Sequence, residues 1–149
     1  MERKEIHPPE LYDHPAFKRV ITVQGDMKLV FIAGQTPSDE NYECVAPGDY
    51  KGQYIQVMES LDIQLKAAGA TWDDVVFRRM FVRDVDEFFK IFYDETLPKY
   101  GDGRPPSTLI GVTRLSQPDG KGYLLSGPDE ILVPLLFASV LEALGDDIS

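Results

Sequence analysis

Residues 54–82 read YIQVMESLDIQLKAAGATWDDVVFRRMFV, and three patterns follow one another within them. In the first half an apolar side chain recurs every three or four residues, which is typical of a helix that buries one face. Gly69 supplies the backbone freedom with which helices often end. Residues 71–74 predict a capped turn, and residues 75–82 are apolar and β-branched enough to form a strand despite two arginines. The helical stripe consists of Tyr54, Val57, Met58, Leu61, Leu65 and Ala68.

Upstream of this segment the sequence predicts two strands, over residues 19–24 and 28–35. The turn residues Gly25-Asp26 between them indicate a hairpin. Residues 36–48 are rich in Pro, Ser, Asp, Asn and Gly and are expected to form a loop. Asp49 is then in place to cap the helix that follows.

Downstream, the pattern predicts a second helix that begins at Asp84 or Asp86 and ends near Pro98. A strand is expected over residues 108–113. A last strand, almost wholly apolar and therefore buried on both faces, is expected over residues 131–140.

The order of these elements predicts the architecture. We expect one α/β (α+β) domain over residues 1–149, with an irregular lead-in over residues 1–15 and an acidic tail over residues 141–149. Two helices pack naturally on one face of a mixed six-stranded sheet. The other face then has no helix to cover it, and an apolar face needs a partner, so we expect a closed homo-oligomer.

Composition narrows the class of function. The chain has 25 acidic and 15 basic residues and a formal net charge of −10, which repels the phosphate backbone of nucleic acids. No run of 18 apolar residues is present, so no membrane span is expected. Cys44 is the sole cysteine, which fits a reducing, cytoplasmic setting. His7 and His14 have no third ligand near them in the sequence, so no metal site is expected. No Gly-rich phosphate loop is present in the sequence, and no cofactor is expected.

Four segments, taken in series, resemble the Rid (YjgF) family. The resemblance covers roughly residues 16–140 and implies a chorismate-mutase-like fold. It also implies a homotrimer with ligand clefts between its subunits. The best-known members hydrolyse reactive enamines and imines to ketoacids and ammonia. The segments are LVFIAGQ at 29–35, AAGATWDDVV at 67–76, FVRD at 81–84 and RPPSTLIGVTRL at 104–115.

The chain also departs from the pattern of the active deaminases. These proteins carry Pro-Ala-Arg-Ser where this chain reads PPST at residues 105–108. Aligned on Arg114, Ser107 takes the position of the family arginine, whose bidentate fork binds the substrate carboxylate and cannot be reproduced by a serine. By the same resemblance, Leu136 takes the place of a glutamate that positions water, and Phe17 that of a tyrosine.

The resemblance implies one pocket at the subunit boundary. Its apolar members favour apolar ligand surface. A carboxylate is expected to bind weakly unless another arginine reaches in, because a buried unpaired charge is costly. No catalytic residue is assigned, and Ser107 has no visible base to make it a nucleophile. The pocket residues are Phe17, Gly34, Gln35, Ser107, Thr108 and Leu136, with Tyr93, Arg79, Arg83 and Arg104 as further candidates.

Simpler roles compete for several of these residues. Arg79 and Arg83 are four residues apart on one strand face, where ion pairs between subunits are the more ordinary role. Arg104 lies in a loop that favours solvation. Ser107 and Thr108 are equally suited to bonding nearby backbone groups at a strand start.

Two classes of function fit this pattern. The first is an enzyme that hydrolyses an enamine or imine, or catalyses a related water-addition or tautomer step, on a non-standard substrate. The second is a non-catalytic trimer that binds a small apolar metabolite or a partner protein. The charge of −10 disfavours a third class, the ribonucleases.

Overall fold

The chain folds into two layers, with helices on one side and strands on the other. The structure is a computed structural model that describes residues 1–41, 43–96, 104–113, 115 and 133–140. This part of the chain has two α-helices, and the expected mixed α+β class is confirmed. The elements are β1 (Glu2–Ile6), β2 (Val20–Gln24), β3 (Lys28–Phe31), α1 (Tyr50–Ala67), the 3₁₀ helix η1 (Trp72–Asp74), β4 (Phe77–Val82), α2 (Val85–Thr96), β5 (Ser107–Gly111) and β6 (Val133–Val140).

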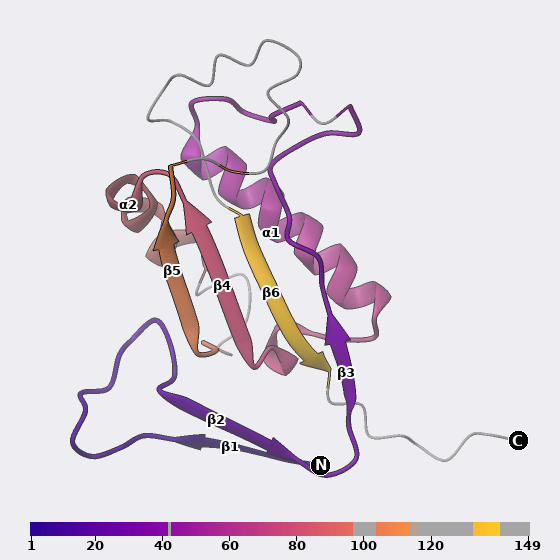
Figure 1. Cartoon of the computed structure of the whole chain (residues 1–149), viewed down its shortest axis with the longest axis vertical. Helices are drawn as coiled ribbons and strands as arrows, with labels where there is room; N and C mark the ends of the chain where they lie inside the picture. The colour runs from indigo at the N-terminus through magenta and orange to yellow at the C-terminus, as the bar shows by residue number, and fades with distance from the viewer. Residues whose placement is uncertain (42, 97–103, 114, 116–132, 141–149) are drawn as a thin grey trace, which may run out of the picture.

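The strands belong to two sheets rather than to the single six-stranded sheet expected from the sequence. In the described part of the chain, β3, β6, β4 and β5 form a four-stranded sheet in that order, and β1 and β2 form a separate pair. β4 and β5 run parallel, whereas β6 is antiparallel to both of its neighbours. In the view of Figure 1 the β1–β2 pair lies below the ends of the four-stranded sheet.

The hairpin expected around Gly25 is wrong. The chain does turn there, and Gly25 has a φ of 104°. However, β2 pairs with β1, within the segment expected to be irregular, and β3 pairs with β6, more than 100 residues away. A turn signal is local and says nothing about which strand edge will be paired, and the charged sequence ERKEI of β1 has little strand character of its own.

Both helices begin at a capping aspartate. Asp49 accepts a hydrogen bond from the backbone N–H of Gly52 at 3.0 Å, as the sequence predicts. Asp84 accepts from the N–H groups of Asp86 and Glu87, both at 3.0 Å, so Asp84 rather than Asp86 caps α2. The expected end of α1 is also confirmed, since Gly69 has a φ of 77° just after it.

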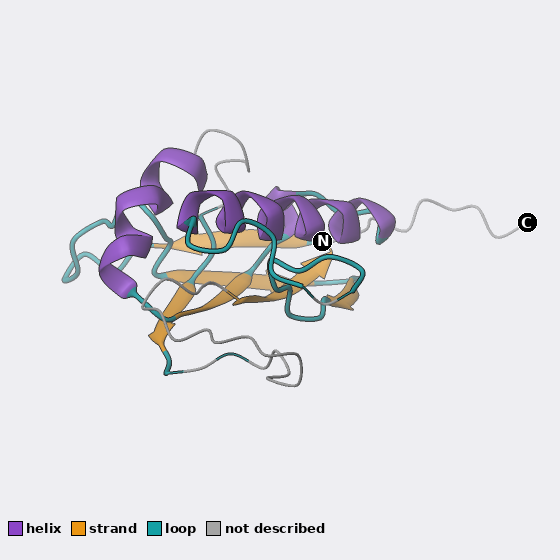
Figure 2. Cartoon of the chain, turned by 90° about the horizontal axis from the view of Figure 1, so that it is seen from above, coloured by secondary structure: helices purple, strands orange, loops and turns teal. Residues whose placement is uncertain are grey.

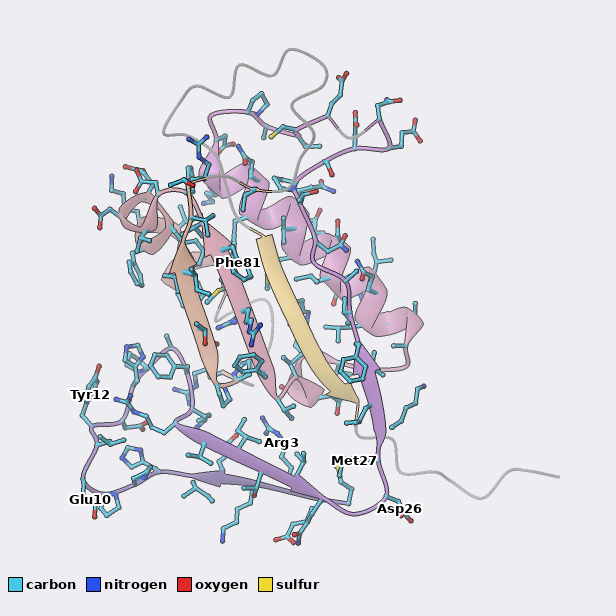
Figure 3. All side chains as sticks on the ribbon, viewed as in Figure 1. Arg3, Glu10, Tyr12, Asp26, Met27 and Phe81 are labelled. Atoms are coloured by element: carbon cyan, nitrogen blue, oxygen red, sulfur yellow. The ribbon has the colours of Figure 1, made fainter. Side chains whose placement is uncertain are left out.

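Figure 2 shows both helices on one face of the sheet. The apolar stripe of α1 is buried there, and Val57, Leu61 and Leu65 are fully buried. The opposite face carries apolar side chains that no helix of the described chain covers. Phe31 is 73% exposed and Leu29 59% exposed, and Figure 3 looks onto the strands that carry them and Phe81.

Candidate functional site

A cavity of about 150 Å³ lies between β4, β5 and α2, on the face of the sheet that the helices cover. The segment that precedes β2 closes one side of it. Its walls are largely aromatic and aliphatic, and three polar side chains interrupt them: His14, Arg78 and Ser107. The apolar lining residues are Ala16, Phe17, Met80, Phe88, Phe89, Phe92 and Leu109.

Strand alternation places Arg78 in this cavity. Side chains of β4 point alternately to the two faces of the sheet. Arg78, Met80 and Val82 are buried on the helix side, whereas Arg79 is exposed on the other. Only 4% of Arg78 is exposed, which is rare for an arginine without an anionic partner.

The Arg78 guanidinium has one hydrogen bond and one aromatic contact. Its Nε donates to Ser107 Oγ at 3.2 Å, and its central carbon lies 5.3 Å from the centroid of the Phe92 ring. No carboxylate among the described residues forms an ion pair with it. Burial lowers the pKa of Arg78, an effect that Tyr54 partly offsets. A guanidinium still stays protonated in proteins, so the cavity holds a buried positive charge.

Ser107 orients this arginine rather than acting on a ligand as a nucleophile. Its hydroxyl donates to the backbone carbonyl of Pro105 at 2.7 Å and accepts from Arg78. The hydroxyl proton is therefore engaged by a carbonyl, and a carbonyl is no general base. The register explains the contact, because Arg78 and Ser107 are direct partners on the parallel strands β4 and β5.

The register also relates Arg78 to Leu136, the residue that the resemblance puts in place of the family glutamate. Leu136 of β6 is the partner of Arg78 on its other side. Arg78 thus occupies the middle of three adjacent positions, between the residue expected in place of the family arginine and the residue expected in place of its glutamate.

His14 and Phe17 are held at the cavity by hydrogen bonds between distant parts of the chain. Their rings are stacked, with centroids 4.1 Å apart and an angle of 19° between the planes. The backbone N–H of Lys18 donates to the Arg104 carbonyl at 2.7 Å, and Arg104 Nη1 donates to the Pro15 carbonyl at 3.1 Å. The segment that carries both rings is thereby tied to the loop that leads into β5 and Ser107.

The structure brings only part of the expected pocket together within one chain. Phe17 and Ser107 line the cavity. Thr108 does not, because it follows Ser107 on the strand and points to the other face. Arg79 lies on that same face, and Arg83 lies just beyond the end of β4 without lining the cavity. Arg104 bonds to Pro15, as described above, and does not line it either.

Gly34 and Gln35 lie at a different place in the sheet. β3 ends at Phe31, so both residues belong to the loop beyond it rather than to the strand expected up to residue 35. β3 and β5 are the two edges of the four-stranded sheet, which at about 4.8 Å per strand puts them about 14 Å apart. One copy of the chain therefore does not bring Gly34 to Ser107. The side chains of Tyr93 and Leu136 fall outside the described part of the structure.

Sequence reasoning missed Arg78 and His14 as cavity residues. For Arg78 a signal was present, since it alternates with Met80 and Val82 and must share their buried face. For His14 the sequence offered none, because the fold of its irregular segment depends on contacts with residue 104. Within the described residues no group of three or more His, Cys, Asp or Glu could bind a metal ion. Neither of the two described helices is long and apolar enough to span a bilayer.

Comparison with known proteins identifies the class. The family model for endoribonuclease L-PSP matches residues 13–121. The chain belongs to this family, which includes the Rid and RutC proteins, so the family predicted from the sequence is confirmed.

Particular relatives are similar to this chain over much of its length. A RutC family protein of Pyrococcus horikoshii is 34% identical over 88 residues, which are 58% of this chain and 68% of the relative. The 3-aminoacrylate deaminase RutC of Acinetobacter baylyi is 34% identical over 116 residues, 78% of this chain and 90% of that protein. The Rid-family protein YyfB of Yersinia pestis shares the fold, with a TM-score of 0.70 at 24% identity over 94% of this chain and all of that one.

Proposed function

We propose that this chain is a small-molecule enzyme of the Rid type that hydrolyses an enamine or imine bearing an anionic group. The observation that carries the proposal is Arg78, a buried guanidinium in an apolar cavity with no ion-pair partner among the described residues. Burying an unpaired charge costs on the order of several kcal/mol, even after the protein relaxes around it. A ligand carboxylate would remove this cost and accept a charge-assisted, two-pronged hydrogen bond.

Arg78 changes the expectation for the substrate. The sequence alone favoured a ligand with little acidity, because Ser107 replaces the family arginine. With Arg78 one strand away, the cavity suits a short apolar skeleton that ends in a carboxylate. The name of the relative from Acinetobacter baylyi supports this class, because 3-aminoacrylate is an enamine with a carboxylate.

The reaction needs water, a positioned substrate and little else. The enamine tautomerises to an imine, water adds across the C=N bond, and the C–N bond breaks to release ammonia and leave a carbonyl. Arg78 would hold the carboxylate, and the aromatic walls formed by Phe88 and Phe92 would limit access of bulk water. Positioning and desolvation of this kind can lower a barrier substantially without a titratable nucleophile.

The working unit in this proposal is a homotrimer. Phe31 and Leu29 are large exposed apolar side chains on the open sheet face, which is a surface that a second copy of the chain would cover. A second copy would also bring Gly34 and Gln35, which lie at the opposite sheet edge, to the cavity at β5 and so form the cleft between subunits. We place the protein in the cytoplasm on the basis of its single cysteine, and its charge of −10 disfavours ribonuclease activity.

One observation favours the alternative of a non-catalytic binder. None of the described residues that line the cavity is a carboxylate, so this part of the site has no counterpart of the family glutamate. A trimer that binds a small carboxylic acid without turnover would need only Arg78 and the apolar walls.

The test measures ammonia release from freshly generated 2-iminobutyrate and from 3-aminoacrylate, above the spontaneous rate. Wild-type protein should accelerate at least one reaction in proportion to its concentration. Arg78→Met should reduce kcat/KM by at least about 100-fold, since each of the two hydrogen bonds to a charged group contributes about 1.5–3 kcal/mol. Lys90→Met is the matched control, because it removes one positive charge from an exposed position on α2, where pairing with Glu87 contributes little.

The two functions are separated by a binding measurement on the same proteins. Calorimetry with 2-oxobutyrate should show binding that Arg78→Met abolishes and Lys90→Met retains. Binding without ammonia release would favour the non-catalytic alternative. Neither binding nor turnover would refute both.

A further inference from the structure

We infer that His14 donates a hydrogen bond to the reacting centre through its Nε2–H group. The fold determines that the proton is on Nε2, as the contacts of the ring show. The inference rests on the proposed function and deepens it, because together with Arg78 it defines a ligand with two acceptors. One acceptor is a carboxylate. The other is the oxygen or nitrogen of the carbonyl or imine next to it.

The first argument is the tautomer. Nδ1 of His14 accepts a hydrogen bond from the backbone N–H of Ala16 at 3.1 Å. A ring nitrogen that accepts carries no proton, so in the neutral ring the proton is on Nε2. The bond made by one ring nitrogen thus determines what the other can do, and here Nε2 is a donor.

The second argument is that the ring is fixed and its donor is free. The ring stacks on Phe17, and the segment that carries it is tied to Arg104 by two hydrogen bonds. Nε2 makes no hydrogen bond to any residue of the described chain, although the ring lines the cavity. A donor that is oriented before the ligand arrives loses little entropy on binding.

The third argument is the difference between His14 and Arg78 as donors. Arg78 is a permanent cation and suits a carboxylate. A neutral N–H suits an uncharged acceptor, or one on which charge develops only during the reaction. The cavity therefore holds two different recognition groups, and a ligand that satisfies both carries a carboxylate and a second, uncharged acceptor such as a carbonyl or imine.

In the reaction His14 would act without transferring a proton. Water bonds to the imine carbon through its oxygen, and one water proton goes to the imine nitrogen to give a carbinolamine. The C–N bond then breaks, the hydroxyl proton leaves with ammonia, and a carbonyl remains. Nε2–H would hydrogen-bond to the oxygen throughout, and this bond strengthens as negative charge gathers on that atom.

The test compares two ligands that differ only in the second acceptor, 2-oxobutyrate and butyrate, by calorimetry. Wild-type protein should bind 2-oxobutyrate about 3- to 10-fold more tightly, the effect of one neutral hydrogen bond of about 0.5–1.5 kcal/mol. His14→Phe keeps a ring to stack on Phe17 but has no donor. It should bind the two ligands equally, with the affinity for butyrate unchanged. His14→Gln restores a donor and should recover part of the preference.

Nitrogen-15 NMR of the His14 ring, with His7→Gln protein used to assign the signals, gives an independent readout. It should report the neutral tautomer with its proton on Nε2 and none on Nδ1, with Nε2 shifting when 2-oxobutyrate binds. A proton on Nδ1, or an unchanged ligand preference in His14→Phe, would overturn the inference. Failure of both ligands to bind wild-type protein would instead refute the carboxylate site at Arg78, on which the proposed function rests. Ammonia release plays no part in this test.

Discussion

Replacing Arg78 with methionine should stabilise the protein while abolishing ligand binding. The reason is that the arginine is 4% exposed and has no anionic partner in the described chain. Methionine keeps an unbranched apolar stem in the same cavity wall. What changes is the charge.

The magnitude follows from the contacts of Arg78. The substitution loses the Nε bond to Ser107, worth about 1.5–3 kcal/mol for a charged donor, and a contact with the Phe92 ring worth about 1 kcal/mol. It removes the penalty for a buried ion, which is several kcal/mol, and apolar replacements of buried charges are often stabilising by about 1–4 kcal/mol. We expect a net gain of about 1 kcal/mol, or about 3 °C in Tm for a chain of this size.

The assay is thermal unfolding at one fixed protein concentration, because the stability of an oligomer depends on concentration. Arg78→Met should unfold at a higher temperature than wild type, and Arg78→Lys, which keeps the charge without the fork, at a lower one. Adding 2-oxobutyrate at 100 times its Kd should stabilise wild type by about 2.7 kcal/mol and leave Arg78→Met unchanged. A fall of several degrees for Arg78→Met would refute the reasoning, since it would make Arg78 a structural residue.

Three further predictions test the rest of the description. Combining Arg78→Ser with Ser107→Arg moves the guanidinium by one strand, about 4.8 Å. Calorimetry should show that 2-oxobutyrate binding is lost in Arg78→Ser alone and largely regained in the double variant. No recovery in the double variant would contradict a site shared by the two positions. Asp49→Ala removes the cap of α1 and should lower the free energy of unfolding by about 1 kcal/mol in a denaturant titration; an unchanged midpoint would mean that the cap contributes nothing. Phe31→Asp should convert the proposed trimer to a monomer in light scattering. Ile63 on α1 is 67% exposed, and the control variant Ile63→Asp should leave the trimer intact. A wild-type monomer at micromolar concentration would rule out the trimer itself.

The helices could be predicted from the sequence because their signals are local. The apolar stripe of α1, its cap at Asp49 and its end at Gly69 all lie within a few turns of chain, and each is where the sequence placed it. Strand pairing could not be predicted in the same way. Whether β3 joins β2 or β6 depends on an edge contributed from the far end of the chain, and no nearby residue encodes that choice.

The same distinction between local and long-range determinants explains which residues of the site could be predicted from the sequence. The resemblance to the Rid family predicts Phe17 and Ser107 as pocket residues, and both line the cavity. Arg78 was predictable too, because strand alternation puts it on the buried face with Met80 and opposite Arg79. His14 could not have been found, since its place depends on hydrogen bonds that join its segment to residue 104.

The pairing of Arg78 with Ser107 and Leu136 has a consequence for how loss of a functional group is judged in proteins of this fold. In a sheet a residue has neighbours along its own strand and neighbours across the adjacent strands. A sequence alignment compares residues at one chain position and does not show which residues are neighbours across the strands. The charge at position 78 reaches the cavity that Ser107 lines from the neighbouring strand. Positions 78, 107 and 136 therefore form one lateral row, and the functional group should be sought anywhere in that row.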